Sequence, residues 1–238
     1  MLQPLTLSHA SAAHSNSGLI DASAVNWTLS QSGTTPSFTN TGTITIGTGR
    51  VWQINNGTLN QTAGTIGGPG TLSFQAVTAN FTTNFSNATT GLAVDNSTLN
   101  GPGTITNATG QTMTLRYTTI GATSALDNQG TLVLNGTIAM NGPLTTAPGT
   151  IVRLQGDGTT GFATLTSAAS LTNNGTIELT SITSAYGATL AVTGAGTLTN
   201  AAGATITSLV GAGGTRTLDA QLNNLGTVTM FQPLTLSH

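Results

Sequence analysis

The sequence has no cysteine and no lysine, and its one glutamate is Glu178. Without cysteine, the chain cannot form disulfide bonds or hold zinc or an iron–sulfur cluster through thiolates. Helices with solvated charged faces need Lys and Glu, so the shortage of both excludes a mainly helical protein. The only cationic side chains besides histidine are Arg50, Arg116, Arg153 and Arg216. Four dispersed arginines form neither a basic nucleic-acid-binding patch nor a polybasic membrane segment.

Aromatic residues make up only 4% of the chain, which is little for a wide globular core. The net charge of −2 and the hydrophobic content of 37% differ from those of disordered chains, which combine low hydrophobicity with high charge. The abundant residues are small or polar, with 31 Gly, 51 Thr and 20 Asn. We therefore expect a folded chain whose narrow core extends along an axis.

The segments 1–9 and 230–238 read MLQPLTLSH and MFQPLTLSH, so eight of nine positions match at a separation of 229 residues. The shared Pro, Gln and His are uncommon in this chain, which disfavours a chance match. We interpret residues 1–238 as a single segment, one 229-residue long unit plus a nine-residue overlap, from a tandem array. On this interpretation Met1 is an internal residue, and export signals lie elsewhere on the parent chain.

A shorter repeat runs inside the long unit. It reads as an apolar residue, a small polar residue, Asn, a spacer with Gly, and then alternating Thr and apolar residues, as in FTNTGTITI from Phe38 and LDNQGTLVL from Leu126. The spacing of its Asn positions ranges from 18 to 27 residues and averages about 23. A following long unit would place its first such position 21 residues after Asn224, so the short period continues across the junction. The marker positions are Asn16, Asn40, Asn60, Asn87, Asn107, Asn128, Thr146, Asn173, Asn200 and Asn224.

The pattern predicts a parallel β-solenoid of about ten coils of roughly 23 residues. Segments such as GTLVL alternate at period two, which is typical of a strand with one buried face, and the preceding Gly and Asn are turn residues. Stacked coils spaced ~4.8 Å apart give a rod of roughly 48 Å. We expect the marker side chains to form one structural ladder, in which each amide donates to the next along the axis. We expect bulges or loops in the segments from Gln75 and Gly156.

The phrases LTNNGTIEL from Leu171, GTLTNAAGATI from Gly196 and LDNQGTLVL resemble the strand repeats of very large bacterial surface proteins. These include autotransporter passengers, filamentous-haemagglutinin-type adhesins and related β-solenoid fibres. The resemblance covers most of the chain but is one of pattern. It implies a right-handed parallel β-helix and an extracellular or cell-surface place in bacteria. It transfers no site residue and names no receptor.

The sequence predicts no catalytic, cofactor-binding or metal-binding residue. The carboxylates fall mostly in different coils, and Asp127 beside Asn128 reads as a turn residue. Two histidines without nearby carboxylates are a weak metal signal, so His9, its repeat equivalent His238 and His14 are not predicted as ligands. The glycine-rich segments lack the strand–helix setting of phosphate loops. The acidic residues are Asp21, Asp95, Asp127, Asp157, Glu178 and Asp219.

These observations predict a non-catalytic structural segment of a long extracellular filament or adhesin shaft. Its expected partners are identical units joined head to tail, with lateral bundling of the weakly charged rods as a further expectation. We expect no nucleic acid, no membrane span in this segment and no cofactor. Asn-X-Ser/Thr sequons leave surface glycosylation open. They begin at Asn26, Asn56, Asn60, Asn80, Asn84, Asn87, Asn96, Asn107, Asn135 and Asn174.

The alternatives are a carbohydrate-binding or ice-binding face and, less favoured, a polysaccharide-degrading β-helix enzyme. A flat array of T-X-T pairs would serve ice binding, but the variable spacing of the markers argues against it. The pairs are Thr43/Thr45, Thr104/Thr106, Thr112/Thr114, Thr197/Thr199, Thr205/Thr207 and Thr227/Thr229.

Overall fold

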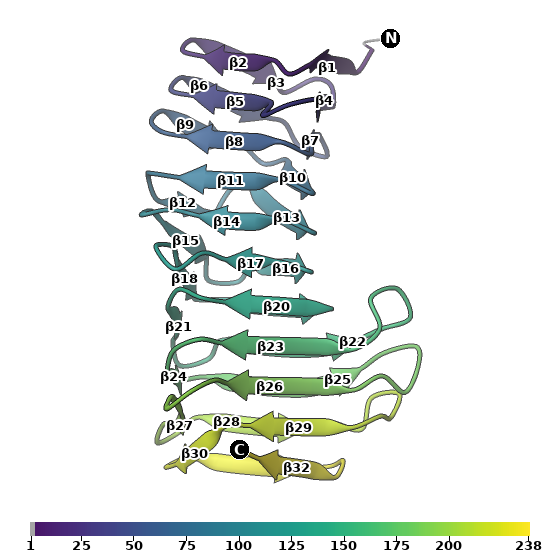
Figure 1. Cartoon of the computed structure of the whole chain (residues 1–238), viewed down its shortest axis with the longest axis vertical. Coiled ribbons are helices and arrows are strands. Elements are labelled where there is room, and N and C mark those ends of the chain that lie inside the picture. Colours follow the sequence, from purple (N-terminus) through teal and green to yellow (C-terminus); the bar gives the residue numbers. More distant parts are fainter. Residues whose placement is uncertain (1–2) are drawn as a thin grey trace.

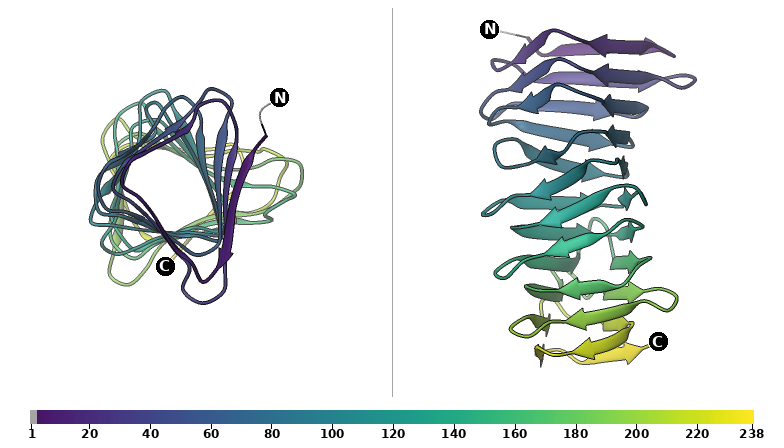
Figure 2. Two further views of the ribbon diagram at one scale, coloured as in Figure 1. Left: turned by 90° about the horizontal axis from the view of Figure 1, so that it is seen from above. Right: turned by 90° about the vertical axis from the view of Figure 1, so that its left-hand side faces the viewer.

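The computed structural model describes residues 3–238, and every regular element in that range is a β-strand. The strands form a rod of stacked coils, with the N-terminal coil at one end and the C-terminal coil at the other (Figure 1). Seen from above, the chain runs clockwise as it descends from the N-terminus, so the winding is right-handed (Figure 2). This confirms the predicted right-handed parallel β-helix.

Each coil contributes one strand to each of three faces, named here in chain order as the first, second and third face, except the last coil, which has no strand on the third face. The first corner joins the first and second faces, and the second corner joins the second and third faces. The third corner joins the third face to the first face of the next coil. The first two faces hold eleven strands each, so the rod has eleven coils rather than ten. The average coil is correspondingly shorter, at about 22 residues.

The first face consists of β1 (Leu5–Ala10), β4 (Trp27–Ser32), β7 (Val51–Asn55), β10 (Thr71–Gln75), β13 (Gly91–Asp95), β16 (Thr112–Arg116), β19 (Thr131–Asn135), β22 (Ile151–Gly156), β25 (Thr176–Ser181), β28 (Thr205–Ser208) and β31 (Thr227–Met230). The second face consists of β2 (Ala13–Asn16), β5 (Ser37–Asn40), β8 (Thr58–Gln61), β11 (Thr78–Phe81), β14 (Thr98–Asn100), β17 (Thr119–Ile120), β20 (Thr137–Met140), β23 (Ala163–Ser167), β26 (Ala188–Val192), β29 (Arg216–Asp219) and β32 (Leu234–Ser237).

The third face is divided into three shorter sheets, with breaks after β9 and after β21. Its strands are β3 (Leu19–Ala22), β6 (Thr43–Ile46) and β9 (Thr65–Gly67), then β12 (Phe85–Ser86), β15 (Thr104–Asn107), β18 (Ala125–Asn128) and β21 (Leu144–Thr146), then β24 (Leu171–Asn173), β27 (Thr197–Asn200) and β30 (Gln221–Asn224).

Strand formation follows from the period-two alternation. In β19, Leu132 and Leu134 point into the rod and are fully buried, whereas Thr131 and Val133 are partly exposed. Each strand pairs in parallel with the equivalent strand one coil before and one coil after, so an isolated coil could neither pair its backbone nor bury its leucines. The core is therefore built by stacking rather than by any single coil.

The backbone at the first corner takes the left-handed conformation in four successive coils. Asn56, Ala76, Asn96 and Tyr117 have φ between 45° and 61°, and each backbone N–H donates to a carbonyl of the next coil. A left-handed residue turns the chain sharply between two faces. Only Asn is well suited to this conformation, so the stacked hydrogen bonds must hold Ala76 and Tyr117 in it.

The two predicted interruptions have different outcomes. Residues 157–161 form a protruding loop closed by the antiparallel bridge between Asp157 and Gly161, as predicted. The segment from Gln75 forms no such insertion, because β11 and β12 lie within a coil of only 20 residues, measured from Leu72 to its partner Leu92. The prediction of a loop there was wrong, but the third face is interrupted in this segment, between β9 and β12.

Candidate functional site

The marker residues form an asparagine ladder, but it occupies two columns rather than one. At the second corner, the Asn16 amide donates to Asn40 at 2.8 Å, and the Asn40 amide donates to Gln61 at 2.9 Å. All three side chains are buried. The next residue in this register is Phe81, which cannot continue the hydrogen bonds, so the column ends there.

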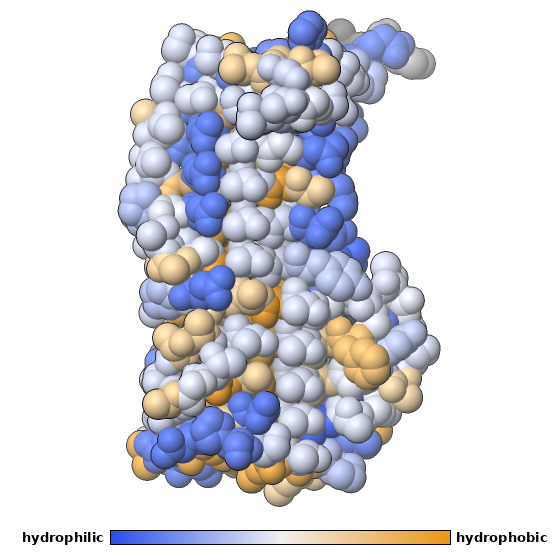
Figure 3. Space-filling view, viewed as in Figure 1, coloured by the Kyte–Doolittle hydropathy of each residue, from blue (hydrophilic) through white to orange (hydrophobic). Residues whose placement is uncertain are grey.

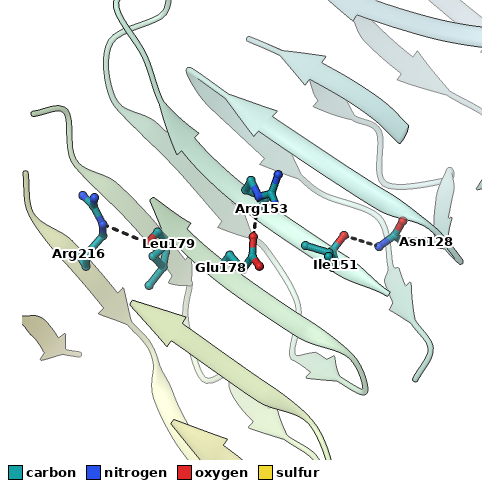
Figure 4. Close-up of polar contacts among 6 residues, drawn as sticks. All are labelled: Asn128, Ile151, Arg153, Glu178, Leu179 and Arg216. Atoms are coloured by element: carbon teal, nitrogen blue, oxygen red, sulfur yellow. Dashed lines mark hydrogen bonds and ion pairs between the residues drawn. The ribbon is translucent and has the colours of Figure 1, made fainter. Parts of the chain in front are cut away.

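The second column lies at the third corner, after the third face. The Asn87 amide donates to Asn107 at 2.8 Å, and the Asn107 amide donates to Asn128 at 2.6 Å. The Asn128 amide donates to the backbone oxygen of Ile151 at 2.9 Å, although its register partner is Thr146 (Figure 4). The Thr146 hydroxyl in turn donates to the backbone oxygen of Thr172.

The same column resumes on the C-terminal side of Thr146. The Asn173 amide donates to Asn200 at 2.9 Å, and the Asn200 amide donates to Asn224 at 2.7 Å. In every side-chain step of both columns the amide donates toward the C-terminal end of the rod. The prediction of a single column was wrong because the same local motif folds equally well at two corners.

Asn60 is not part of the ladder, and the neighbouring Gln61 takes its place. Asn60 instead lies on the outer side of the second face, where its side-chain oxygen accepts a hydrogen bond from Asn80 at 2.8 Å. Asn80 accepts one from Asn100 at 3.2 Å. This outer asparagine column is partly exposed. Sequence reasoning missed it because an outer and an inner Asn differ by a single position in the register.

Glycine follows two positions after several ladder residues because the stacked turns leave no room for a side chain. A Cβ at Gly42 would stand 2.1 Å from the backbone oxygen of Gly18, and one at Gly130 would stand 2.4 Å from that of Gln111. The ladder oxygen also accepts the N–H of this glycine, as at Asn128, where the distance is 3.3 Å. The Asn-X-Gly motif thus combines a local turn with close stacking of coils.

Stacking pairs two of the charges that are far apart in the sequence. The Nε atom of Arg153 lies 2.6 Å from the Glu178 carboxylate on the first face, one coil away (Figure 4). It is the one ion pair within 4 Å among residues 3–238. Both side chains are partly exposed, so the pair contributes little to stability.

Arg216 is fully buried and has no carboxylate partner. Its Nε donates to the backbone oxygens of Leu179 and Leu209, each at 3.1 Å (Figure 4). Its two terminal nitrogens reach the backbone oxygens of Tyr186, Val210, Gly213 and Thr215 and the hydroxyl of Ser181. Burial lowers the pKa of Arg216 from its ordinary value. This side chain joins the first-corner loop of β25–β26 to that of β28–β29.

The loop at residues 157–161 is organised by the Asp157 carboxylate. One carboxylate oxygen accepts the backbone N–H groups of Thr159 and Thr160 at 2.8 and 2.6 Å and the Thr160 hydroxyl at 2.9 Å. Burial raises the pKa of Asp157, but these hydrogen bonds and the positive charge of Arg116 outweigh burial. The pKa therefore lies below the usual value for Asp. Asn135 donates to the other carboxylate oxygen at 3.2 Å.

Three aromatic side chains gather at the first corner, and together they are called the aromatic corner: Tyr117, Phe162 and Tyr186. The Phe162 and Tyr186 rings meet edge to face at 5.8 Å, and the Tyr117 hydroxyl donates to the backbone oxygen of Thr160 at 2.7 Å. Phe162 is 65% exposed. Figure 3 shows hydrophobic surface over the loops that protrude on this side of the rod.

A polar edge runs along the first face beside the aromatic corner. Gln75, Asp95, Arg116 and Asn135 are register partners in four successive coils. The first three line a shallow depression in the first face. The Nε atom of Arg116 is buried and has no hydrogen-bond partner among the described residues. Sequence reasoning treated Asp95 and Arg116 as scattered, because their spacing gives no sign that they belong to one edge, to which Asp157 is joined through Asn135.

The T-X-T pairs do not form a single array. The pairs at Thr43, Thr104 and Thr197 lie on the third face, whereas the others lie on the first face. Of the six pairs, only Thr205/Thr207 and Thr227/Thr229 are in register with each other. These pairs therefore do not form the flat threonine array that ice binding would need, in agreement with the variable spacing of the markers.

The sequons fall into exposed and buried sets. Asn87, Asn107 and Asn135 are buried, so a glycan could not be attached to them in the folded rod. Asn26, Asn56, Asn84, Asn96 and Asn174 are exposed.

The histidines do not converge with acidic residues. His9 lies on the first face and His14 on the second, and His238 follows β32. Within residues 3–238, no group of three or more His, Cys, Asp or Glu side chains is placed to hold a metal ion. The same range contains no helix long and apolar enough to cross a membrane.

Comparison of this chain with protein-family models, with curated proteins and with solved structures finds no match.

Proposed function

We propose that this chain is a structural segment of a long extracellular or cell-surface β-solenoid rod, in which identical units join head to tail. The observation that carries the proposal is that both terminal coils have the features of interior coils that have lost a neighbour. Their strands have an unpaired edge, and side chains that would be covered inside the rod are exposed there. Leu5 is 58% exposed at one end, and Leu236 is 62% exposed at the other.

These ends differ from the rest of the rod in a way that favours further stacking. Leu5 and Leu236 have the inward orientation of their register partners Trp27 and Leu218, which are buried by the coil beyond them. Unpaired edges with apolar residues are templates for pairing with another chain. One more coil would satisfy the backbone groups and cover the leucines at once.

Electron microscopy of the purified chain tests the proposal. We expect thin, unbranched fibres with an axial repeat of about 50 Å, from the eleven coils of the rod at ~4.8 Å each. Leu236→Asp, which places a charge in the stacking surface, should abolish the fibres. Phe162→Asp at the aromatic corner is the matched control and should leave them intact. Compact single particles from the unsubstituted chain would contradict the proposal.

A second candidate function is carbohydrate binding at the first corner, favoured by the aromatic corner beside the polar edge. Aromatic rings offer flat apolar faces with a polar rim, which suits sugar rings. Gln75, Asp95 and Arg116, which line the depression in the first face, supply hydrogen-bonding groups beside them. Binding of the chain to a polysaccharide array tests this candidate. Phe162→Ala and Tyr186→Ala should each remove the binding, and unchanged binding in both variants would exclude this site.

A further inference from the structure

The two copies of the segment QPLTLSH lie on different faces of the rod. In the first copy, Leu5 and Leu7 belong to β1 on the first face, in register with Trp27 and Leu29. In the second copy, the equivalent leucines belong to β32 on the second face, in register with Arg216 and Leu218. The leucines point inward in both copies, so the segment keeps its orientation while it moves by one face.

The ladder columns show the same displacement independently. The markers up to Gln61 lie at the second corner, and those from Asn87 onward lie at the third corner. The 26 residues from Gln61 to Asn87 therefore carry the chain through one turn and one additional face. The third face breaks at this point, between β9 and β12.

Resting on the proposed tandem rod, we propose that the 229-residue unit spans ten turns and one face, so that each unit is rotated by about a third of a turn from the unit before it. The C-terminal edge is then covered by a second copy of this chain, the next unit of the tandem rod, which docks out of phase. The C-terminal LTLSH segment of one unit is also the start of the next unit, and the strand that follows it is the equivalent of Ala13–Asn16. It pairs with β30 on the third face instead of continuing onto the second.

This docking satisfies the end of the second ladder column. Asn224 accepts a hydrogen bond from Asn200 and is itself exposed at the end of the rod. The equivalent of Asn16 in the next unit follows Asn224 by 21 residues, which is close to the average coil. It would stand directly over Asn224 and continue the column in the same donor direction. An in-phase junction would instead place that side chain at the second corner.

The rotation has a consequence for any surface feature. The aromatic corner of one unit lies at the first corner, that of the next unit would lie at the second corner, and that of the third unit at the third corner. The arrangement returns after three units, or ~150 Å at ~4.8 Å per coil. A tandem rod would thus present the same loops on all three sides.

Distance measurement between spin labels in two-unit chains tests the rotation. The natural-junction chain joins residues 1–238 to residues 10–238. The in-phase control joins residues 1–227 to residues 5–238, so that Leu5 takes the inward position of Val228 and the second copy of β1 takes the place of β31. Because the chain has no cysteine, Phe162→Cys introduces one label in each unit. Thr109→Cys, in an exposed turn, repeats the comparison if the first variant fails to fold.

We expect a narrow distance near 48 Å for the control and a narrow distance about 10 Å longer for the natural junction, from strand spacing and coil girth. Equal narrow distances in the two chains would overturn the rotation but leave the stacked rod standing. A broad distribution for the natural junction would show that the units do not stack, which overturns the rotation and the proposed function together.

Discussion

The two halves of the rod use aromatic residues in opposite ways. Every aromatic residue up to Phe85 is buried in the core, and every later one is at least partly exposed. In the N-terminal half, Trp27 and Trp52 stack at 4.6 Å with Phe38 edge-on to both. In the C-terminal half the core is aliphatic, and Phe162 lies on the surface.

This difference shows that the core, which holds the coils together, and the corner loops, which form the surface, can vary independently. Large rings fill the N-terminal coils with few side chains, and their corners are mostly tight turns. The C-terminal coils carry longer first-corner loops, which the buried Arg216 holds from below. A rod whose faces are fixed by register can vary its corners, since an inserted loop leaves the strand pairing unchanged.

The largest expected effect comes from removing a core ring. Trp52→Ala should lower the local free energy of unfolding around coils 2 to 4 by about 3–5 kcal/mol, through lost burial and the cavity left behind. Amide hydrogen exchange measures this. Phe162→Ala is the control on the exposed side and should change stability by less than about 0.5 kcal/mol. Equal effects of the two substitutions would remove the contrast between the halves.

Arg216 should be the most sensitive position of the C-terminal half. Arg216→Leu leaves several buried carbonyls without a donor, so we expect a loss of about 3 kcal/mol and faster amide exchange in residues 182–187 and 209–215. Arg216→Lys keeps the charge but not the spread of donors, and should restore only part of the protection. Full protection in the lysine variant would show that charge alone holds the loops.

The ladder should matter more than the outer asparagine column. Asn107→Ala removes the hydrogen bonds to Asn87 and Asn128 in a buried place and should cost about 1–3 kcal/mol. Asn80→Ala, which loses comparable bonds in a partly exposed column, should cost less than about 1 kcal/mol. Chemical denaturation compares the two variants. A larger loss of stability for Asn80→Ala would mean that the outer column contributes more to the stacking of the coils than the buried ladder does.

The smallest effect should be local and dependent on pH. The pKa of Asp157 is lowered in the folded chain, so the unfolded chain binds its proton more readily. Its stabilisation is therefore present above the ordinary Asp pKa of ~3.9 and is lost as the pH falls through the lower folded value. Amide exchange of residues 157–161 should accelerate over that acidic range, whereas Asp157→Asn should show no such dependence. An unchanged pH profile in that variant would assign the transition to another group.

Much of the fold is predictable because strand alternation and turn chemistry act locally. The segments GTLVL and LTNNGTIEL identify strands and corners, and the spacing of the markers indicates the length of a coil. The identity of the corner is not predictable from the motif, because an Asn-X-Gly turn has the same local geometry wherever it stands. For this reason Asn16 and Asn87 look equivalent in sequence yet lie in different columns.

The sequence by itself determines an all-β chain of stacked coils with a narrow core, because it has too few charged residues for solvated helices and because its short period-two strands recur at the spacing of one coil. Only the tertiary structure decides what lies beside what. It joins Arg153 to Glu178, sets Arg216 among carbonyls of two loops, and gathers Tyr117, Phe162 and Tyr186 at one corner. Each of these contacts depends on the register between coils about 22 residues apart, and a change of one residue in that register reverses the direction of a side chain.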